Sequence, residues 1–164
     1  EEEKHPWLQA EKNMLREFSS AGRGIFGICL GAQLMAEAFG GKAFPMDEWD
    51  IGWRPASLLE GAAAIMPLYW HSSSFTLPPK ATATARGASG LILGMRRGFR
   101  EVGYQFHTEI DEVRLEAVLN TLKPGMKGDI PSERELRADA IKFMGPLQNW
   151  YFQQLDRWLN SLSA

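Results

Sequence analysis

Apolar residues recur at helical spacing near the start of the chain and then gather into short continuous runs. After Pro6, whose fixed φ suits a first helical turn, the spacing predicts a helix that ends at Ser19–Gly22. The apolar run Gly24–Ile28 predicts a buried strand of the kind found in parallel sheets. Residues Gly31–Phe39 predict a second helix, closed by Gly40 and Gly41. This order of helix, strand, turn and helix is typical of an α/β domain.

The middle of the chain changes to short apolar or alternating runs separated by Gly, Pro and Ser. These runs predict strands at Gly52–Leu58, Ile65–Trp70, Ala81–Ala85, Leu91–Met95 and Val102–His107. The last third is helical, and it predicts helices at Glu109–Leu122, Ser132–Met144 and Leu147–Leu162, with Gly145 and Pro146 as the final break. No repeat or low-complexity linker interrupts the pattern, so we expect one domain over residues 1–164.

Composition and charge narrow the function classes. The 164 residues are 45% hydrophobic and carry a net charge of −2, which fits a globular domain and argues against nucleic acid as a partner. A single cysteine allows no internal disulfide, and this favours a cytoplasmic location. No apolar run reaches the roughly 18 residues that cross a bilayer, and no signal peptide pattern is present. The chain starts at Glu1 without Met, so we expect it to begin inside a longer gene product.

Cys29 is the strongest candidate for chemistry. It lies between a predicted strand and a predicted helix, with Gly27 and Gly31 on either side. Glycines at these positions allow a sharp strand-to-helix turn that holds the intervening side chain out at the sheet edge. The helix N-terminus favours a thiolate, and the backbone N–H of Leu30 is placed to donate to an oxyanion. A buried core cysteine is the competing interpretation.

His107 and Glu109 are the candidate partners of Cys29. They are two residues apart at a predicted strand end, so we expect their side chains to leave one face. A carboxylate there can orient the imidazole, whose other nitrogen takes the thiol proton. His71 is the competing base but has no nearby carboxylate, and the serines after it predict a substrate-contacting loop; His5 is expected in solvent. One Cys and three scattered His give no metal-ligand spacing, and no phosphate-binding motif is present, so no metal or cofactor is expected.

Several motifs resemble the class I (triad-type) glutamine amidotransferases, especially their GMP synthase-like branch. Gly27–Gln33 followed by two glycines resembles the nucleophile motif, and Gly103–Glu109 resembles the G-x-Q-F-H-P-E motif. Glu48–Trp53 and Trp70–Pro78 resemble the segments between them. The resemblance covers about Pro6 to Ile110.

The resemblance implies a flavodoxin-like three-layer α/β/α fold with a central, mostly parallel sheet. It also implies that Cys29 attacks the side-chain amide of glutamine, that His107 shuttles the proton with Glu109 behind it, and that a γ-glutamyl thioester is hydrolysed. Gln33, Ser72 and Ser73 match positions that hold the amino acid end of glutamine in relatives. The ammonia released passes, in most members, to a synthetase domain or subunit.

Three departures from the family pattern qualify these expectations. Thr108 replaces the usual Pro, and Ser72 and Ser73 replace a Gly-Asp pair of the close branch. The βαβαβ block that normally comes first, with the second oxyanion-hole donor, has no counterpart in this chain, and the stretch Glu60–Pro67 is short. The domain is therefore expected to be N-terminally incomplete. Two alternatives stay open: a γ-glutamyl peptide or conjugate hydrolase with the same triad, and a non-catalytic subunit.

Overall fold

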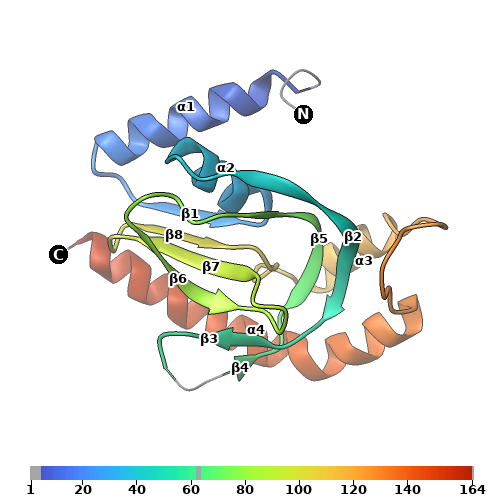
Figure 1. Cartoon of the computed structure of the whole chain (residues 1–164). Coiled ribbons are helices and arrows are strands. Elements are labelled where there is room, and N and C mark those ends of the chain that lie inside the picture. Colours follow the sequence, from blue (N-terminus) through green and yellow to red (C-terminus); the bar gives the residue numbers. More distant parts are fainter. Residues whose placement is uncertain (1–4, 62–63, 164) are drawn as a thin grey trace.

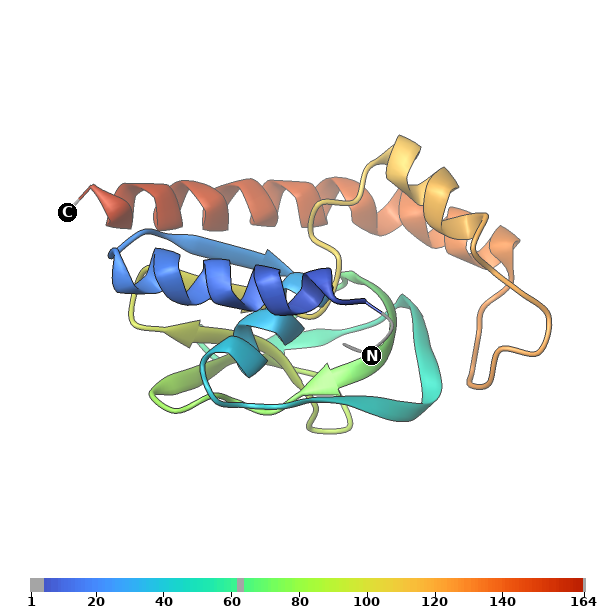
Figure 2. The ribbon, with the colours of Figure 1, turned by 90° about the horizontal axis from the view of Figure 1, so that it is seen from above.

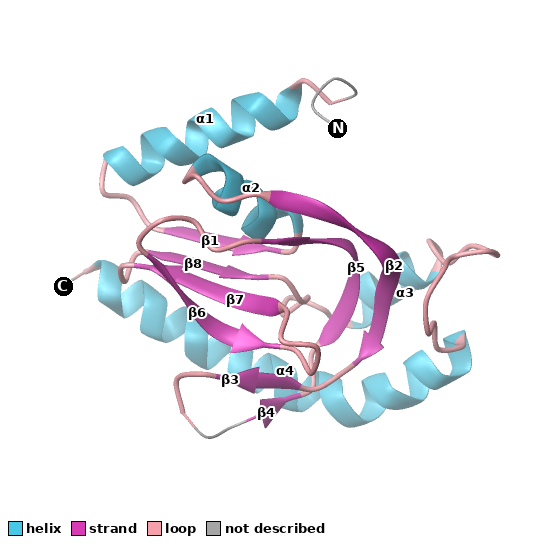
Figure 3. Ribbon diagram, viewed as in Figure 1, coloured by secondary structure: helices cyan, strands magenta, loops and turns pink. Residues whose placement is uncertain are grey.

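The computed structural model describes residues 5–61 and 64–163. The chain is folded into four helices and eight strands within these ranges (Figures 1 and 3). In chain order the elements are α1 (Trp7–Ser20), β1 (Ile25–Ile28), α2 (Leu30–Ala38), β2 (Ala43–Trp53), β3 (Ala56–Leu58), β4 (Ala64–Ile65), β5 (Leu68–Phe75), β6 (Ala81–Arg86), β7 (Ile92–Arg97), β8 (Glu101–Tyr104), α3 (Glu112–Leu119) and α4 (Glu133–Leu162).

Six strands form the central sheet, in the order β1-β8-β7-β6-β3-β4. The pair β1–β8 is parallel, and the four other described pairs of this sheet are antiparallel. A flavodoxin-like α/β fold is therefore confirmed, but the described sheet is mixed, not mostly parallel. Short connections explain the difference, because strands β6, β7 and β8 are joined by turns too short for the crossover that a parallel pair requires.

Helices cover the two faces of this sheet (Figure 2). On one face, Ala32, Met35 and Ala36 of α2 pack with Ile25 and Met95. On the opposite face, α4 places Trp150 and Trp158 against an aromatic cluster; Tyr104 and Trp150 have ring centroids 5.3 Å apart, and Phe26 and Trp158 5.4 Å. Alternation along β1 and β8 sends neighbouring side chains to opposite layers. The predicted three-layer α/β/α arrangement is confirmed.

A separate two-stranded ribbon, β2 and β5, curves beside the central sheet (Figure 1). Its residues pair antiparallel from Ala43 with Phe75 to Trp53 with Leu68, with a register shift between Pro45 and Asp50. The ribbon packs on α3 and the first half of α4 through a core of buried residues. These are Ile51, Trp53, Leu68, Trp70, Ile110, Leu115, Leu119, Leu136, Ala140 and Leu147. The ribbon carries β5 past the edge where β1 ends, and thus toward Cys29.

Strand boundaries in the middle of the chain differ from the sequence-based expectation. The predicted strand Gly52–Leu58 is divided at Arg54 and Pro55, since Pro cannot donate to a ladder. Pro67 divides the predicted strand Ile65–Trp70 for the same reason. The polar residues Ser72–Ser74, expected in a loop, continue β5, and Ser73 and Ser74 pair with β2.

The last helix is also continuous where a break was predicted. Helix α4 runs through Gly145 and Pro146, and it begins with a capping box between Ser132 and Glu135. Pro146 removes one backbone donor, but it is exposed, so water can satisfy the carbonyl that is freed. The next residue, Leu147, is buried, and tertiary packing of this kind outweighs the local propensity to break.

Candidate active site

The turn that carries Cys29 is a strained elbow between β1 and α2. Cys29 has φ +49° and ψ −106°, a conformation that L-residues avoid and that costs on the order of 1–3 kcal/mol. Its backbone N–H donates to the carbonyl oxygen of Tyr104 at 2.8 Å, which holds the elbow against the end of β8. The strain and its restraint together place the side chain at the carboxyl ends of the parallel pair, as the sequence predicts.

The two flanking glycines have different physical reasons. A Cβ on Gly27 would lie 2.6 Å from Sδ of Met35 and 2.8 Å from the backbone of Gly31, so no side chain fits there. A Cβ on Gly31 would meet nothing within 4 Å. Close approach therefore requires glycine at the first position but not at the second, contrary to the sequence-based argument for both.

His107 and Glu109 meet as predicted, though not on a strand. Nδ1 of His107 lies 2.7 Å from Oε1 of Glu109, on the bend that follows β8. The backbone N–H of His107 donates to the carbonyl oxygen of Leu68 at 2.9 Å, so β5 fixes this bend. Thr108, which stands between them, is fully buried and leaves both neighbours in contact.

The charges of this pair depend on each other and on Cys29. Burial lowers the pKa of His107, but hydrogen bonds to Cys29 and Glu109, with their negative charges, raise it to about 10. Burial raises the pKa of Glu109, and its hydrogen bond and ion pair with His107 outweigh that effect and hold it below the usual value. At neutral pH the pair is an imidazolium held by a carboxylate, and a cation beside sulfur favours the thiolate.

His71, the competing base, has a different environment. It is 3% exposed, and burial together with the positive charge of His107 lowers its pKa to about 4. A neutral imidazole at physiological pH is a weak proton acceptor when its pKa lies so low. His5 is exposed, as expected. The geometry therefore favours His107 over both other histidines.

The predicted substrate-binding residues separate into two groups. Nε2 of Gln33 donates to the carbonyl oxygen of Ser73 at 3.2 Å, so α2 and β5 meet beside the elbow. Ser72 points to the other side of β5, because side chains alternate along a strand. There it lines a cleft of about 540 Å³, together with Met46, Asp47, Glu48, Trp49, Thr121, Lys123, Pro124, Gly125, Met126 and Lys127. Leu30 begins α2 beside Cys29 and is 43% exposed.

One contact of the candidate nucleophile was missed from the sequence. Nε2 of Gln105 lies 3.7 Å from Sγ of Cys29, and the carbonyl oxygen of Trp70 lies 4.0 Å from the same atom. Gln105 is two residues before His107, so the period of two that paired His107 with Glu109 also places Gln105 on that side. Alternation along the predicted strand could therefore have placed Gln105 on the side of Cys29 from the sequence alone.

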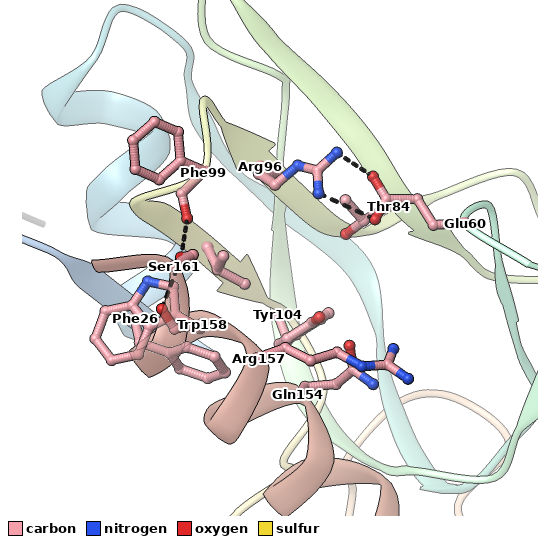
Figure 4. A pocket seen from close by; sticks show the side chains of 11 residues that line it. Phe26, Glu60, Thr84, Arg96, Phe99, Tyr104, Gln154, Arg157, Trp158 and Ser161 are labelled. Atoms are coloured by element: carbon pink, nitrogen blue, oxygen red, sulfur yellow. Dashed lines mark hydrogen bonds and ion pairs between the residues drawn. The ribbon is translucent and has the colours of Figure 1, made fainter. Parts of the chain in front are cut away.

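A cavity of about 170 Å³ lies between α4 and the central sheet (Figure 4). Tyr104, Arg157 and Trp158 line it, and an ion pair between Arg96 and Glu60 stands at its side. Its lining includes neither Cys29 nor the His107–Glu109 pair. This cavity is therefore distinct from the candidate active site.

Across residues 5–61 and 64–163, no group of three His, Cys, Asp or Glu side chains is arranged to hold a metal ion. Among the helices in that described part, none combines the length and apolarity needed to cross a bilayer.

Comparisons with known proteins identify the family of this chain. Residues 3–117 match the family described as glutamine amidotransferase class-I. The glutamine amidotransferase-like protein YfeJ of Salmonella typhimurium is 28% identical over 167 residues, covering 92% of this chain and 65% of that protein. The chain thus spans less than two thirds of the length of this curated relative.

Solved structures show the same fold. A glutamine amidotransferase from Methylobacillus flagellatus superposes with a TM-score of 0.85 at 23% identity, over 94% of this chain and 70% of that one. A glutamine amidotransferase from Thermotoga maritima gives a TM-score of 0.79 at 24% identity, over 99% and 72% of the two chains.

Proposed function

Because the chain belongs to the class-I glutamine amidotransferase family, we propose that its site hydrolyses the side-chain amide of glutamine and releases ammonia. The observation that carries the proposal is the contact of His107 with Glu109, at 2.7 Å, beside a cysteine on a strained elbow. A histidine held by a carboxylate next to a half-buried nucleophile on a sharp turn is the arrangement that covalent acyl transfer requires.

The first half of the reaction forms a thioester. The thiolate of Cys29 attacks the amide carbon of glutamine, and the new oxyanion lies near the N–H of Leu30 at the start of α2. The His107 imidazolium then gives its proton to the leaving nitrogen, so the C–N bond breaks and ammonia departs. Glu109 holds the ring in place during this transfer.

The second half restores the site. Neutral His107 takes a proton from water, and the resulting hydroxide adds to the thioester carbon. Collapse of this intermediate expels the Cys29 thiolate and releases glutamate. Gln33, with Ser73 behind it, holds the amino acid end of the substrate. The ammonia passes to an acceptor site on another protein or segment.

A turnover assay tests this proposal. Glutamine should yield equimolar ammonia and glutamate with the wild-type protein, and Cys29→Ser should remove both products while the circular dichroism spectrum stays unchanged. Arg137→Gln, which breaks a surface ion pair with Glu116, is a control that should retain turnover. Equal product formation by the wild type and Cys29→Ser would overturn the assignment.

A γ-glutamyl conjugate hydrolase is a second candidate, because it would use the same cysteine, histidine and glutamate and would differ only in the group that leaves the γ-carbonyl carbon. Comparing kcat/KM for glutamine with that for γ-glutamyl-glycine separates the two, since the conjugate should be preferred only under this second candidate.

A further inference from the structure

Gln105 is a fully buried polar side chain that connects three elements. Its exposed fraction is 0%, and it lies on the segment between β8 and His107. Its side-chain amide contacts Sγ of Cys29 at 3.7 Å and the side-chain amide of Gln33 at 3.2 Å. Gln33 in turn contacts the carbonyl oxygen of Ser73 at 3.2 Å. A row of amides therefore runs from β5 through α2 to the sulfur.

The chemistry of this row fixes its direction. The Ser73 carbonyl oxygen only accepts hydrogen bonds, so Gln33 must present its NH₂ group there. The same Nε2 atom of Gln33 faces Gln105, which must then present its oxygen, the acceptor of its amide. The NH₂ group of Gln105 is left on the opposite side, facing Sγ of Cys29. Each amide orientation thus follows from the backbone carbonyl at the start of the row.

We propose that Gln105 is a catalytic residue that donates a hydrogen bond to the Cys29 thiolate and stabilises it together with His107. The role rests on the proposed function, in which Cys29 is the nucleophile. Burial makes the contact stronger, because no water competes for an amide that is 0% exposed. Gln105 also orients Gln33, so one side chain couples the nucleophile to the predicted substrate-binding residue.

The other groups around the sulfur of Cys29 differ in their charge. His107 contributes a positive charge, and Glu109 stands behind it at 2.7 Å. His71 of β5 follows Trp70, whose carbonyl oxygen lies 4.0 Å from the sulfur, and its burial keeps the imidazole neutral. Gln105 is the neutral donor of this set, so its removal should change the thiolate without changing the net charge.

Loss of the Gln105 donor should change two features of the alkylation of Cys29, the midpoint and the plateau of its rate–pH profile, with opposite effects on the rate. A hydrogen bond to a charged group is worth roughly a tenfold to hundredfold change in an equilibrium, so Gln105→Leu should shift the midpoint of the rate–pH profile upward by about one to two units. A more basic thiolate is also more nucleophilic, so the plateau rate at high pH should rise by about threefold for each unit. A change in packing alone would not raise the plateau while shifting the midpoint.

The experiment measures carbamoylmethylation of the single cysteine by iodoacetamide against pH. Gln105→Glu is a second variant, which keeps the acceptor for Gln33 and places a carboxylate beside the sulfur; its midpoint should rise further than that of Gln105→Leu. Gln148→Leu is the matched control, since among the described residues its amide is bonded to the Ile110 carbonyl oxygen at 3.0 Å and not to Cys29; its profile should match the wild type.

Midpoints of both Gln105 variants within 0.3 units (~2-fold) of the wild type would overturn the role of Gln105. If Gln105→Leu does not fold, Gln105→Glu alone decides, because an unchanged midpoint beside a new carboxylate contradicts the contact. Alkylation needs no glutamine turnover, so failure of the proposed function would be seen separately, as an absence of ammonia release by the wild type.

Discussion

Replacing Glu109 by Gln tests the electrostatic coupling on which the proposed mechanism depends. The variant keeps the shape of the side chain and removes a negative charge 2.7 Å from Nδ1 of His107. Both partners are mostly shielded from water, with side-chain exposures of 18% for His107 and 30% for Glu109. Solvent screening should therefore weaken their interaction only in part.

The size of the effect follows from the strength of a charge-assisted hydrogen bond. Such a bond contributes about 1.5–3 kcal/mol, and about 1.4 kcal/mol corresponds to one pKa unit. The pKa of His107, about 10 in the wild type, should therefore fall by roughly one to two units in Glu109→Gln. The contact with Cys29 remains, so the pKa should stay above the ordinary histidine value.

Nitrogen NMR of the three histidine rings measures this directly. In ¹⁵N-labelled wild type the His107 ring should remain cationic at pH 8, whereas in Glu109→Gln a titration should begin at lower pH. Glu116→Gln, which removes a surface partner of Arg137, is the matched control and should leave His107 unchanged. A wild-type His107 that titrates near pH 6.5, or equal pKa values in wild type and Glu109→Gln, would refute the reasoning.

The same coupling gives stability a defined pH window. The folded pKa of His107 is raised, so its contribution is complete below about pH 6.5 and is lost as pH rises through about 10. The folded pKa of Glu109 is lowered, so its contribution is complete above about pH 4.5 and is lost as pH falls through the folded value. The difference in unfolding free energy between wild type and Glu109→Gln should therefore be largest between pH 4.5 and 6.5.

Three further predictions concern the scaffold and can be measured by thermal or urea unfolding. Gly27→Ala should lower the free energy of unfolding by about 1–3 kcal/mol through overpacking against Met35. Gly31→Ala, with open space around it, should leave the stability unchanged or raise it. Equal losses of stability in the two variants would contradict this difference in space. Pro146→Ala should raise the melting temperature, because an exposed interior Pro weakens α4 by up to about 3 kcal/mol; a lower melting temperature would contradict this. His71→Gln should flatten the loss of stability between pH 6.5 and 4, because a buried neutral imidazole resists the protonation that the unfolded chain gains; an unchanged acid slope would count against that environment.

Sequence patterns predicted the residues of the candidate site more accurately than the structure around them. Cys29, His107 and Glu109 were found because a glycine-flanked turn and a spacing of two have direct geometric consequences. The elbow of Cys29 and the contact of His107 with Glu109 are present in the structure. Their catalytic roles stay predictions.

Features that depend on distant parts of the chain were missed. Ser72–Ser74 look like a turn in isolation, and the pairing of Ser73 and Ser74 with β2 is what continues the strand. The direction of Gln105 follows from alternation along a predicted strand, but its complete burial and its contact with Gln33 of α2 do not. Pro146 breaks a helix by local rules, but the buried Leu147 beside it keeps α4 continuous. In each case tertiary packing outweighs the local signal.

Covalent trapping of Cys29 tests the central claim most directly. A glutamine analogue with a diazoketone in place of the side-chain amide should add to the reduced protein once, and peptide mass analysis should place the adduct on Cys29, the single cysteine of the chain. Cys29→Ser should remain unmodified, and excess glutamine should slow the labelling of the wild type. Absence of an adduct on the wild type, or labelling that glutamine does not slow, would contradict the account.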